Sequence, residues 1–452
     1  MDAMTGMLTD YALSTSYARL PPSLVHETKR HLIDTLACAL GAYDEPFCAK
    51  LRTFAARYRG EPAATIWGGA QPVSAEMAAF ANGVMLRYLD LNDMYRVKCG
   101  GHPSDIIAGI VAAGEAVQAS GADVIDAINV GYEIYCGFCE TIDFNTLGWD
   151  QPVYGVVATA AACGKLFGLD REAMGNALAL ALVPNMTMIQ TRTGELSGWK
   201  GCAGANACRN GLFAALLARD GFDGPTAAFE GKSGLFDIVG RFAWPGFGGA
   251  TQPYRLPLSH MKRFPVCYHG QGAAQIGAAF HREIDFRRVR GIHIETYRVA
   301  VEMMCNDPTR WAPGSRETAD HSLPYVAATA LVDGDVTSAS FVDERLRDAR
   351  IAKLMAVTTV KEDPRLTAKH PECAPTRVRI TLDDGAEHVK EVDYAAGHAQ
   401  SPLSDQEVEA KFRGMFALHG SRAHCDELLA ALWAFERADH VVEIVKLCAR
   451  AG

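Results

Sequence analysis

The chain has 452 residues, of which 49% are hydrophobic and 21% charged, and its formal net charge is −9. This length exceeds what one hydrophobic core usually serves, so we expect a globular protein of two domains. The acidic balance, with no basic stripe against it, argues against nucleic acid as a partner, and no stretch is long and apolar enough to span a membrane.

The cysteines and the first residues indicate the compartment. Thirteen cysteines are scattered along the chain without a repeated spacing. Residues 1–24 lack the charged region and apolar run of a signal peptide, so we expect reduced thiols in a cytoplasmic protein. The close pair Cys136 and Cys139 lies in an apolar stretch, which favours core packing over redox chemistry.

Residues 1 to about 255 are predicted to be almost wholly helical. Leu32, Leu36 and Leu40 recur at the spacing of a buried helical stripe, and alanine-rich segments follow. Asp170 is a candidate N-cap residue for one of these helices. Because small residues let helices pack closely, this half is predicted to form a compact helical bundle.

The pattern changes near residue 253. Alternating and β-branched runs indicate strands, Asp384-Gly385 is a typical hairpin turn, and an apolar segment closed by Gly334 indicates a helix. Residues 259–403 are therefore predicted to form a smaller α+β domain.

Helices return at Ser404, where Glu407 three residues later completes a capping box. We expect residues 404–452 to pack back on the first domain and complete it. The predicted fold is mainly α, with a large all-helical domain made of residues 1–258 and 404–452 and the smaller α+β domain between them.

The stretch LDLNDMYRVKCGGHPSD is the most informative motif. Asp90 and Asp93 precede a glycine pair and His102, and Ser104 is the predicted N-cap of the apolar helix that follows. A helix start suits a carboxylate or phosphate ligand, and a loop that delivers Asp and His there suits general acid–base chemistry. The alternative is a capping aspartate and a histidine with one structural hydrogen bond.

Two further clusters carry cationic or nucleophilic groups. Arg192 and Lys200 lie in a glycine-interrupted loop before a helix, where a lysine can bind a carboxylate, act as an acid or simply be solvated. Lys262, Cys267 and His269 lie where the two domains meet, and ligands favour such places. Cys267 is either a nucleophile paired with His269 or a packed thiol.

Tyr325 is a third candidate, with His321 one turn earlier on a predicted helix, although a single tyrosine there is more often part of a core. The sequence contains no GxGxxG after a strand, no GxxxxGK[ST], no HExxH and no paired CxxC. Nucleotide, zinc and iron–sulfur chemistry therefore have no support, and cofactor-free acid–base chemistry remains.

Seven ordered segments resemble the MmgE/PrpD family, which includes 2-methylcitrate dehydratase, cis-aconitate decarboxylase and iminodisuccinate epimerase. They are HLIDTLACAL, LRYLDLNDMY, GHPSD, GKLFGLDREA, the loop of Lys200, KRFPVCYHGQ and DHSLPYVAATALVDG. The resemblance implies a helical domain with a lid domain, an active site between the two, neither metal nor cofactor, and a homodimer.

The resemblance also implies residue roles. The loop aspartate of the family falls on Asp90, its loop histidine on His102, its two lysines on Lys200 and Lys262, and its lid tyrosine on Tyr325. We expect His102, oriented by Asp90, to transfer a proton and Tyr325 or Lys200 to act as the acid. The remaining candidates, for substrate binding, are Lys262, Gln151, Arg192, Cys267 and His269.

Two positions depart from the family pattern. Cys267 stands where decarboxylases carry a histidine, whereas His269 matches the dehydratase-like placement. Gln151 stands where relatives usually show a histidine, and glutamine can bind a carboxylate but cannot exchange a proton near neutral pH.

The resemblance predicts a cofactor-independent lyase that acts by general acid–base chemistry on a small di- or tricarboxylate. Dehydration of a 2-methylcitrate-type substrate, the reaction of a hydro-lyase, is the leading case. The alternatives are a decarboxylase or an isomerase/epimerase for a cis-aconitate- or iminodisuccinate-like substrate, and a catalytically silent binding protein.

Overall fold

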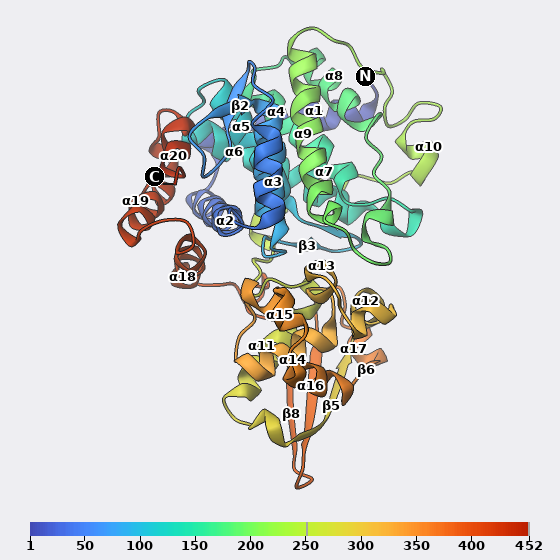
Figure 1. The fold of residues 1–452 in the computed structure, drawn as a ribbon. Coiled ribbons are helices and arrows are strands. Elements are labelled where there is room, and N and C mark those ends of the chain that lie inside the picture. The colour runs from blue at the N-terminus through green and yellow to red at the C-terminus, as the bar shows by residue number, and fades with distance from the viewer. Residues whose placement is uncertain (250–251, 451–452) are drawn as a thin grey trace.

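The computed structural model describes residues 1–249 and 252–450, which form a large helical domain and a smaller α+β domain (Figure 1). Each domain has its own hydrophobic core. One core draws on residues 4–261 and 403–448, and the other on residues 264–382. The predicted mainly α fold with two domains of these kinds is confirmed.

The helical domain begins with α1 (Ala3–Ser14), α2 (Pro22–Gly41), α3 (Pro46–Ala55), α4 (Ala75–Tyr88), α5 (Ile107–Ala116), α6 (Gly121–Thr141), α7 (Pro152–Leu166), α8 (Arg171–Leu182), α9 (Trp199–Arg219) and α10 (Leu235–Val239). The side chain of Asp170 accepts from the first turn of α8, as expected of its N-cap. Small residues do bring the helices close together, because a Cβ added at Gly83 of α4 would lie 2.8 Å from the Cβ of Ala205 on α9.

Short antiparallel strands also occur in this domain, although its sequence was predicted to be almost wholly helical. They are β1 (Ala63–Thr65) with β2 (Pro72–Ser74), and β3 (Tyr95–Arg96) with β4 (Gly100–Gly101). Strands of two or three residues are too short to show an alternating pattern in the sequence.

The α+β domain contains β5 (Val289–Thr296), β6 (Thr358–Glu362), β7 (Thr376–Leu382), β8 (Glu387–Val392), α11 (Gln271–His281), α12 (Arg298–Met304), α13 (Arg316–Ala319), α14 (Leu323–Asp333), α15 (Asp343–Leu346), α16 (Ala349–Ala356) and α17 (Pro364–Thr367). Its strands lie in the order β6-β5-β7-β8, with β5 and β6 parallel and the other pairs antiparallel.

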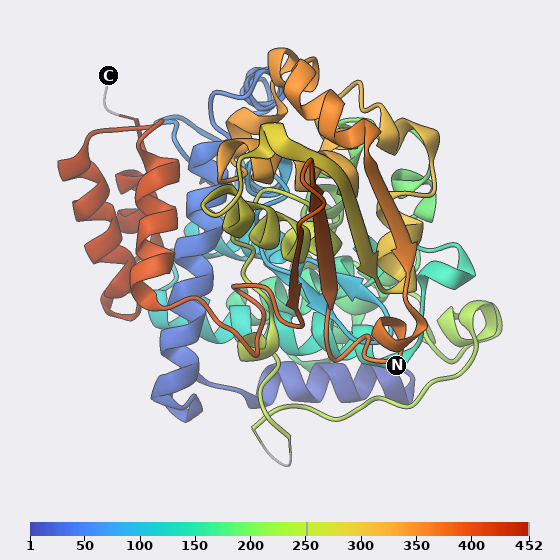
Figure 2. The ribbon, with the colours of Figure 1, turned by 90° about the horizontal axis from the view of Figure 1, so that it is seen from below.

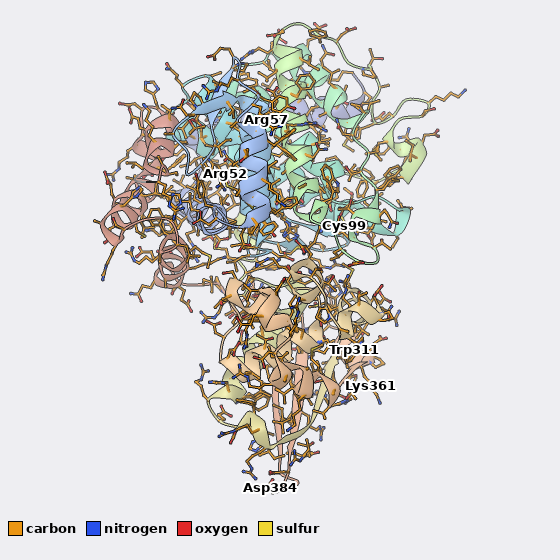
Figure 3. The ribbon with its side chains drawn as sticks, in the orientation of Figure 1. Arg52, Arg57, Cys99, Trp311, Lys361 and Asp384 are labelled. Atoms are coloured by element: carbon orange, nitrogen blue, oxygen red, sulfur yellow. The ribbon has the colours of Figure 1, made fainter. Side chains whose placement is uncertain are left out.

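Two local predictions for this domain are confirmed. β7 and β8 form the expected hairpin, and Asp384 in its turn lies at the end of the domain farthest from the helical domain (Figure 3). Helix α14 ends at Gly334, which adopts the left-handed conformation with φ of 77°.

The chain then returns to the helical domain through α18 (Asp405–Phe416), α19 (Arg422–Trp433) and α20 (Val441–Leu447), which lie along one side of the molecule (Figure 2). The capping box of Ser404 and Glu407 is present. The ammonium of Lys411 on α18 lies 2.5 Å from a carboxylate oxygen of Asp34 on α2. The same ammonium donates to the carbonyls of Leu91 and Lys262, at 2.9 and 2.7 Å, and so holds together the segments that build the cleft described below.

The thirteen cysteines are free thiols, and Cys136 and Cys139 are buried in α6, so the prediction of core packing for this pair is confirmed. Over residues 1–249 and 252–450, no helix has both the length and the apolar composition needed to cross a bilayer.

Candidate functional site

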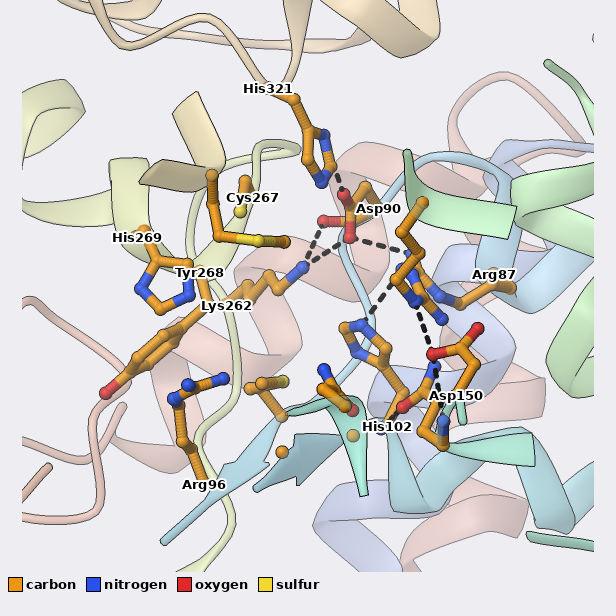
Figure 4. Close-up of a pocket in the computed structure, with 17 residues that line it drawn as sticks. Arg87, Asp90, Arg96, His102, Asp150, Lys262, Cys267, Tyr268, His269 and His321 are labelled. Carbon is orange, nitrogen blue, oxygen red and sulfur yellow. Dashed lines mark hydrogen bonds and ion pairs between the residues drawn. The ribbon is translucent and has the colours of Figure 1, made fainter. Parts of the chain in front are cut away.

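A cleft of about 480 Å³ lies where the two domains meet (Figure 4). The helical domain contributes the end of α4, the β3–β4 hairpin and the segment before α7, and the α+β domain contributes the turns before α11 and α14. Seven predicted site residues line the cleft, namely Asp90, His102, Gln151, Arg192, Lys262, Cys267 and His269.

The carboxylate of Asp90 accepts hydrogen bonds from three cationic side chains. Asp90 follows the end of α4 with φ of 51°, a left-handed conformation that aspartate tolerates better than most residues. Its Oδ1 accepts from Arg87 at 2.7 Å and from Lys262 at 2.5 Å, and its Oδ2 accepts from Lys200 at 2.9 Å. Burial would raise the pKa of Asp90, but these three cations and His321 hold it well below its ordinary value.

His102 is held by partners other than the one expected. Its Nδ1 lies 2.6 Å from the backbone carbonyl of Asp93, and its Nε2 lies 2.9 Å from Nη2 of Arg87. The carbonyl can only accept, so Nδ1 carries the proton and Nε2 accepts from Arg87. Asp90, which we expected to orient His102, does not contact it and acts only through the Arg87 guanidinium, which bonds to both. Burial, followed by Arg87 and Lys262, holds the pKa of His102 well below its ordinary value.

The carboxylate of Asp93 occupies the place at the start of the turn after His102 where we expected a ligand. Ser104 lies inside a 3-10 turn over Pro103–Ile106, and α5 begins only at Ile107, so Ser104 is not the N-cap that the sequence predicted. Oδ1 of Asp93 accepts from the backbone N–H of Ser104 at 3.0 Å and from its hydroxyl at 2.6 Å. A carboxylate of the protein itself therefore fills the place where we expected an anionic ligand.

Gln151 faces the cleft with one end of its amide. Its Oε1 accepts from the backbone N–H of His102 at 2.6 Å and from the hydroxyl of Tyr135 at 2.8 Å. Its Nε2 is buried without a hydrogen-bond partner among the residues that the structure describes. A buried amide donor without a partner is costly, so this atom is suited to a ligand oxygen.

Lys200 does not line the cleft. It lies in the first turn of α9 rather than in the preceding loop, and its ammonium contacts Oδ2 of Asp90 outside the cleft. The same ammonium lies 3.3 Å from Oδ1 of Asp320 and 3.1 Å from Nδ1 of His321. Arg192 does line the cleft, with its Nε 2.7 Å from Oδ1 of Asp150.

Tyr325 is not brought to the site. Its hydroxyl donates to the carbonyl of Ser340 at 2.7 Å inside the core of the α+β domain, and burial raises its pKa to about 12. His321, which the sequence analysis named only as the neighbour of Tyr325, lines the cleft instead. It lies in the turn before α14 and not on the helix, so helical spacing could not identify it.

His321 is surrounded by charged groups. Its Nδ1 lies 2.5 Å from Oδ1 of Asp320 and 3.6 Å from Oδ2 of Asp90. Burial and Lys200 would lower the pKa of His321, but Cys267 and Asp320 raise it above its ordinary value.

Cys267 is coupled to His321 and not to His269. Burial would raise the pKa of the Cys267 thiol, but His321 lowers it below its ordinary value. His269 instead has its Nδ1 2.5 Å from the hydroxyl of Tyr297, and burial followed by Arg96 holds the pKa of His269 well below its ordinary value. The predicted alternative of a Cys267–His269 pair is therefore not formed.

The cleft concentrates positive charge on a chain with a net charge of −9. Four cationic side chains line it, namely Arg87, Arg96, Arg192 and Lys262, whereas the carboxylates that line it are Asp90 and Asp150. Arg87 and Arg96 were not predicted as site residues. Arg87 lies inside a helix and Arg96 in a strand of two residues, and neither belongs to a recognisable sequence motif.

Asp90, Asp320 and His321 are close enough to hold a metal ion. Their oxygens are already engaged by ammonium groups, however, since Lys200 contacts both carboxylates and Lys262 contacts Asp90. A divalent cation here would meet two ammonium groups, so this cluster fits an ion-pair network better than a metal site.

Comparison with known proteins gives matches along most of the chain. Residues 6–243 match the MmgE/PrpD N-terminal domain, and residues 264–435 match the MmgE/PrpD C-terminal domain. A 2-methylcitrate dehydratase from Salmonella typhimurium is 27% identical over 428 residues, which cover 87% of this chain and 85% of that protein. One from Cupriavidus necator is 28% identical over 421 residues, covering 86% and 85%. A cis-aconitate decarboxylase from Homo sapiens is 27% identical over 422 residues, covering 87% and 84%.

We predict that Asp90→Asn destabilises the fold by about 3–5 kcal/mol, because it leaves buried cations without their counter-charge. The free energy of unfolding from urea titration at pH 7 measures this loss. Asp10→Asn is the control, since Asp10 pairs with Arg171 on the exposed surface, where solvent screens the pair, and its loss should leave the free energy of unfolding nearly unchanged. Equal stability of wild type and Asp90→Asn would show that Asp90 does not hold this cluster together.

Proposed function

This chain belongs to the MmgE/PrpD family, and from that premise we propose that it is a cofactor-independent lyase for a small di- or tricarboxylate. The leading reaction is dehydration of a 2-methylcitrate-type substrate, as in the names of two relatives. The observation that carries the proposal is the cleft itself, in which four cations surround two histidines whose pKa values are displaced in opposite directions.

His102 is the proposed base. Its neutral form predominates at pH 7 because its pKa is lowered, and its Nε2 becomes available when Arg87 turns toward a substrate carboxylate. A bound polycarboxylate also brings negative charge, which raises the pKa of His102 and makes it a better base. Removing a proton next to a carboxylate builds negative charge on the carboxylate oxygens, which Arg87 and Lys262 are placed to stabilise.

His321 is the proposed acid. Its raised pKa favours the protonated form, and it lies across the cleft from His102 (Figure 4). In a dehydration the C–H bond breaks with its proton going to His102, the C–O bond breaks, and the hydroxyl leaves as water with the proton of His321. This assignment replaces Tyr325 and Lys200, the acids that the sequence favoured, since neither of them lines the cleft.

The family offers two alternatives with the same proton chemistry, a decarboxylase and an isomerase or epimerase. Gln151 supports a substrate that differs from methylcitrate, because its amide presents a non-titrating donor where relatives usually carry a histidine. A catalytically silent binding protein is the third possibility, and the presence of both His102 and His321 in the cleft argues against it.

The deciding experiment incubates the protein with citrate, 2-methylcitrate, cis-aconitate or iminodisuccinate in D₂O and follows each by proton NMR. Conversion of citrate or 2-methylcitrate into an alkene product identifies a dehydratase, release of CO₂ from cis-aconitate with the proton signals of the shortened product a decarboxylase, and deuterium exchange without a new product an epimerase. We expect one of these in wild type, unchanged after dialysis against EDTA, and a rate at least about 10²-fold lower in His102→Ala. A thermal shift with these ligands but no turnover would instead favour a binding protein.

The two histidines also predict the pH dependence. The neutral form of His102 persists below its ordinary pKa near 6.5, so kcat/KM should not fall as the pH drops to about 6. The protonated form of His321 is lost as the pH rises through its raised pKa, so kcat/KM should fall on the alkaline side. His321→Gln should be slower than wild type and lack the alkaline limb. An alkaline limb that persists in His321→Gln would contradict the assignment of the acid.

We propose further that the protein is a homodimer. In support, α9 exposes Trp199 and Phe213, each 49% accessible, and their separation of 14 residues places both on one face of the helix. Sedimentation equilibrium should give twice the chain mass of 48.8 kDa, and Trp199→Glu with Phe213→Glu should lower it to one chain mass. A monomeric wild type would overturn the proposal.

A further inference from the structure

Arg96 differs from the other three cationic side chains that line the cleft. Arg87 and Lys262 bond to Asp90, and Arg192 bonds to Asp150. The side chain of Arg96 makes no ion pair and no hydrogen bond within residues 1–249 and 252–450, and its Nε is buried without a partner. A partly buried guanidinium without a counter-charge is costly unless a ligand supplies one.

The groups around Arg96 are neutral. His269 and His370 both have a lowered pKa, for which burial is the first cause and the charge of Arg96 a further one. Tyr268, which also lines the cleft, is un-ionised because burial raises the pKa of its hydroxyl. Among the residues that the structure describes, none supplies a negative charge beside Arg96 at this end of the cleft.

Arg96 is also set apart from the other group of donors. Figure 4 shows Arg96 and Asp150 on opposite sides of the cleft, with Lys262 and His102 between them. Arg192, which is bonded to Asp150, has an Nη2 that is buried without a partner among the described residues, as does the amide nitrogen of Gln151. The cleft thus offers donors at both ends and the proposed base in the middle.

We propose that Arg96 binds the substrate carboxylate that is remote from the reacting carbon, and that it thereby selects for a third carboxylate. This inference rests on the proposed function and deepens it. A planar guanidinium can hold a carboxylate with two parallel hydrogen bonds, which a lysine in the same place cannot do. The position of Arg96 on the β3–β4 hairpin fixes the distance between that carboxylate and the carbon that faces His102.

The test uses non-reacting ligands, so that binding is measured apart from chemistry. Isothermal titration calorimetry compares propane-1,2,3-tricarboxylate with succinate, which lacks one carboxylate, for wild type, Arg96→Gln and Arg96→Lys. Arg96→Gln should weaken binding of the tricarboxylate by about 10-fold or more and that of succinate by less than about 2-fold. The affinity of Arg96→Lys for the tricarboxylate should lie between those of wild type and Arg96→Gln. Lysine keeps the positive charge but cannot make two parallel hydrogen bonds to a carboxylate.

Arg263→Gln is the matched control, since Arg263 follows Lys262 in the chain but is exposed and does not line the cleft. It should leave binding of both ligands unchanged. Equal losses for the two ligands in Arg96→Gln, or no loss for either, would overturn the role of Arg96 while leaving the proposed function intact if wild type turns over a polycarboxylate. Failure of wild type to bind or convert any polycarboxylate would overturn the proposed function, and the role of Arg96 with it.

Discussion

The carboxylate of Asp90 is contacted by charged groups from both domains. Arg87 and Lys200 reach it from the helical domain, Lys262 from the junction between the domains, and His321 from the α+β domain. Such a cluster is expensive to bury, and it is stable only because each charge has a partner at hydrogen-bond distance. The relative position of the domains is therefore fixed by the same contacts that set the charge of the cleft. A change at Asp90 alters domain closure and site electrostatics together.

Asp93 has a different task, although it lies only three residues further on. Its Oδ1 caps the turn that begins at Pro103, its Oδ2 accepts from the hydroxyl of Tyr132 at 2.8 Å, and its carbonyl fixes the proton of His102 on Nδ1. Asp90 thus pairs with the cations around the cleft, whereas Asp93 holds the loop that carries His102. This division explains why the sequence reads as one motif of acid residues while the structure uses them separately.

The fold, the family and seven of the residues that line the cleft could be predicted from the sequence. Helical periodicity, the Gly334 helix end, the hairpin at Asp384 and the capping box at Ser404 are local signals, and each is confirmed because each depends on neighbours within a few residues. The pairing of side chains was harder to predict, because it depends on loops from distant parts of the chain. Arg87 comes between Asp90 and His102 only because α4 and the β3–β4 hairpin fold together, and no spacing in the sequence indicates this.

The two departures from the expected family pattern both affect the proton balance of the cleft. Cys267 and His321 shift each other's pKa oppositely, so the thiolate of Cys267 and the protonated form of His321 stabilise each other. A histidine at position 267 would instead be a second group competing for a proton and, when charged, would lower the pKa of His321. Gln151, where the family resemblance implies a histidine, is an amide that cannot gain or lose a proton near neutral pH. His102, His321 and Cys267 therefore remain as the groups placed to exchange protons with a ligand in the cleft, because His269 is neutral and bonded to Tyr297.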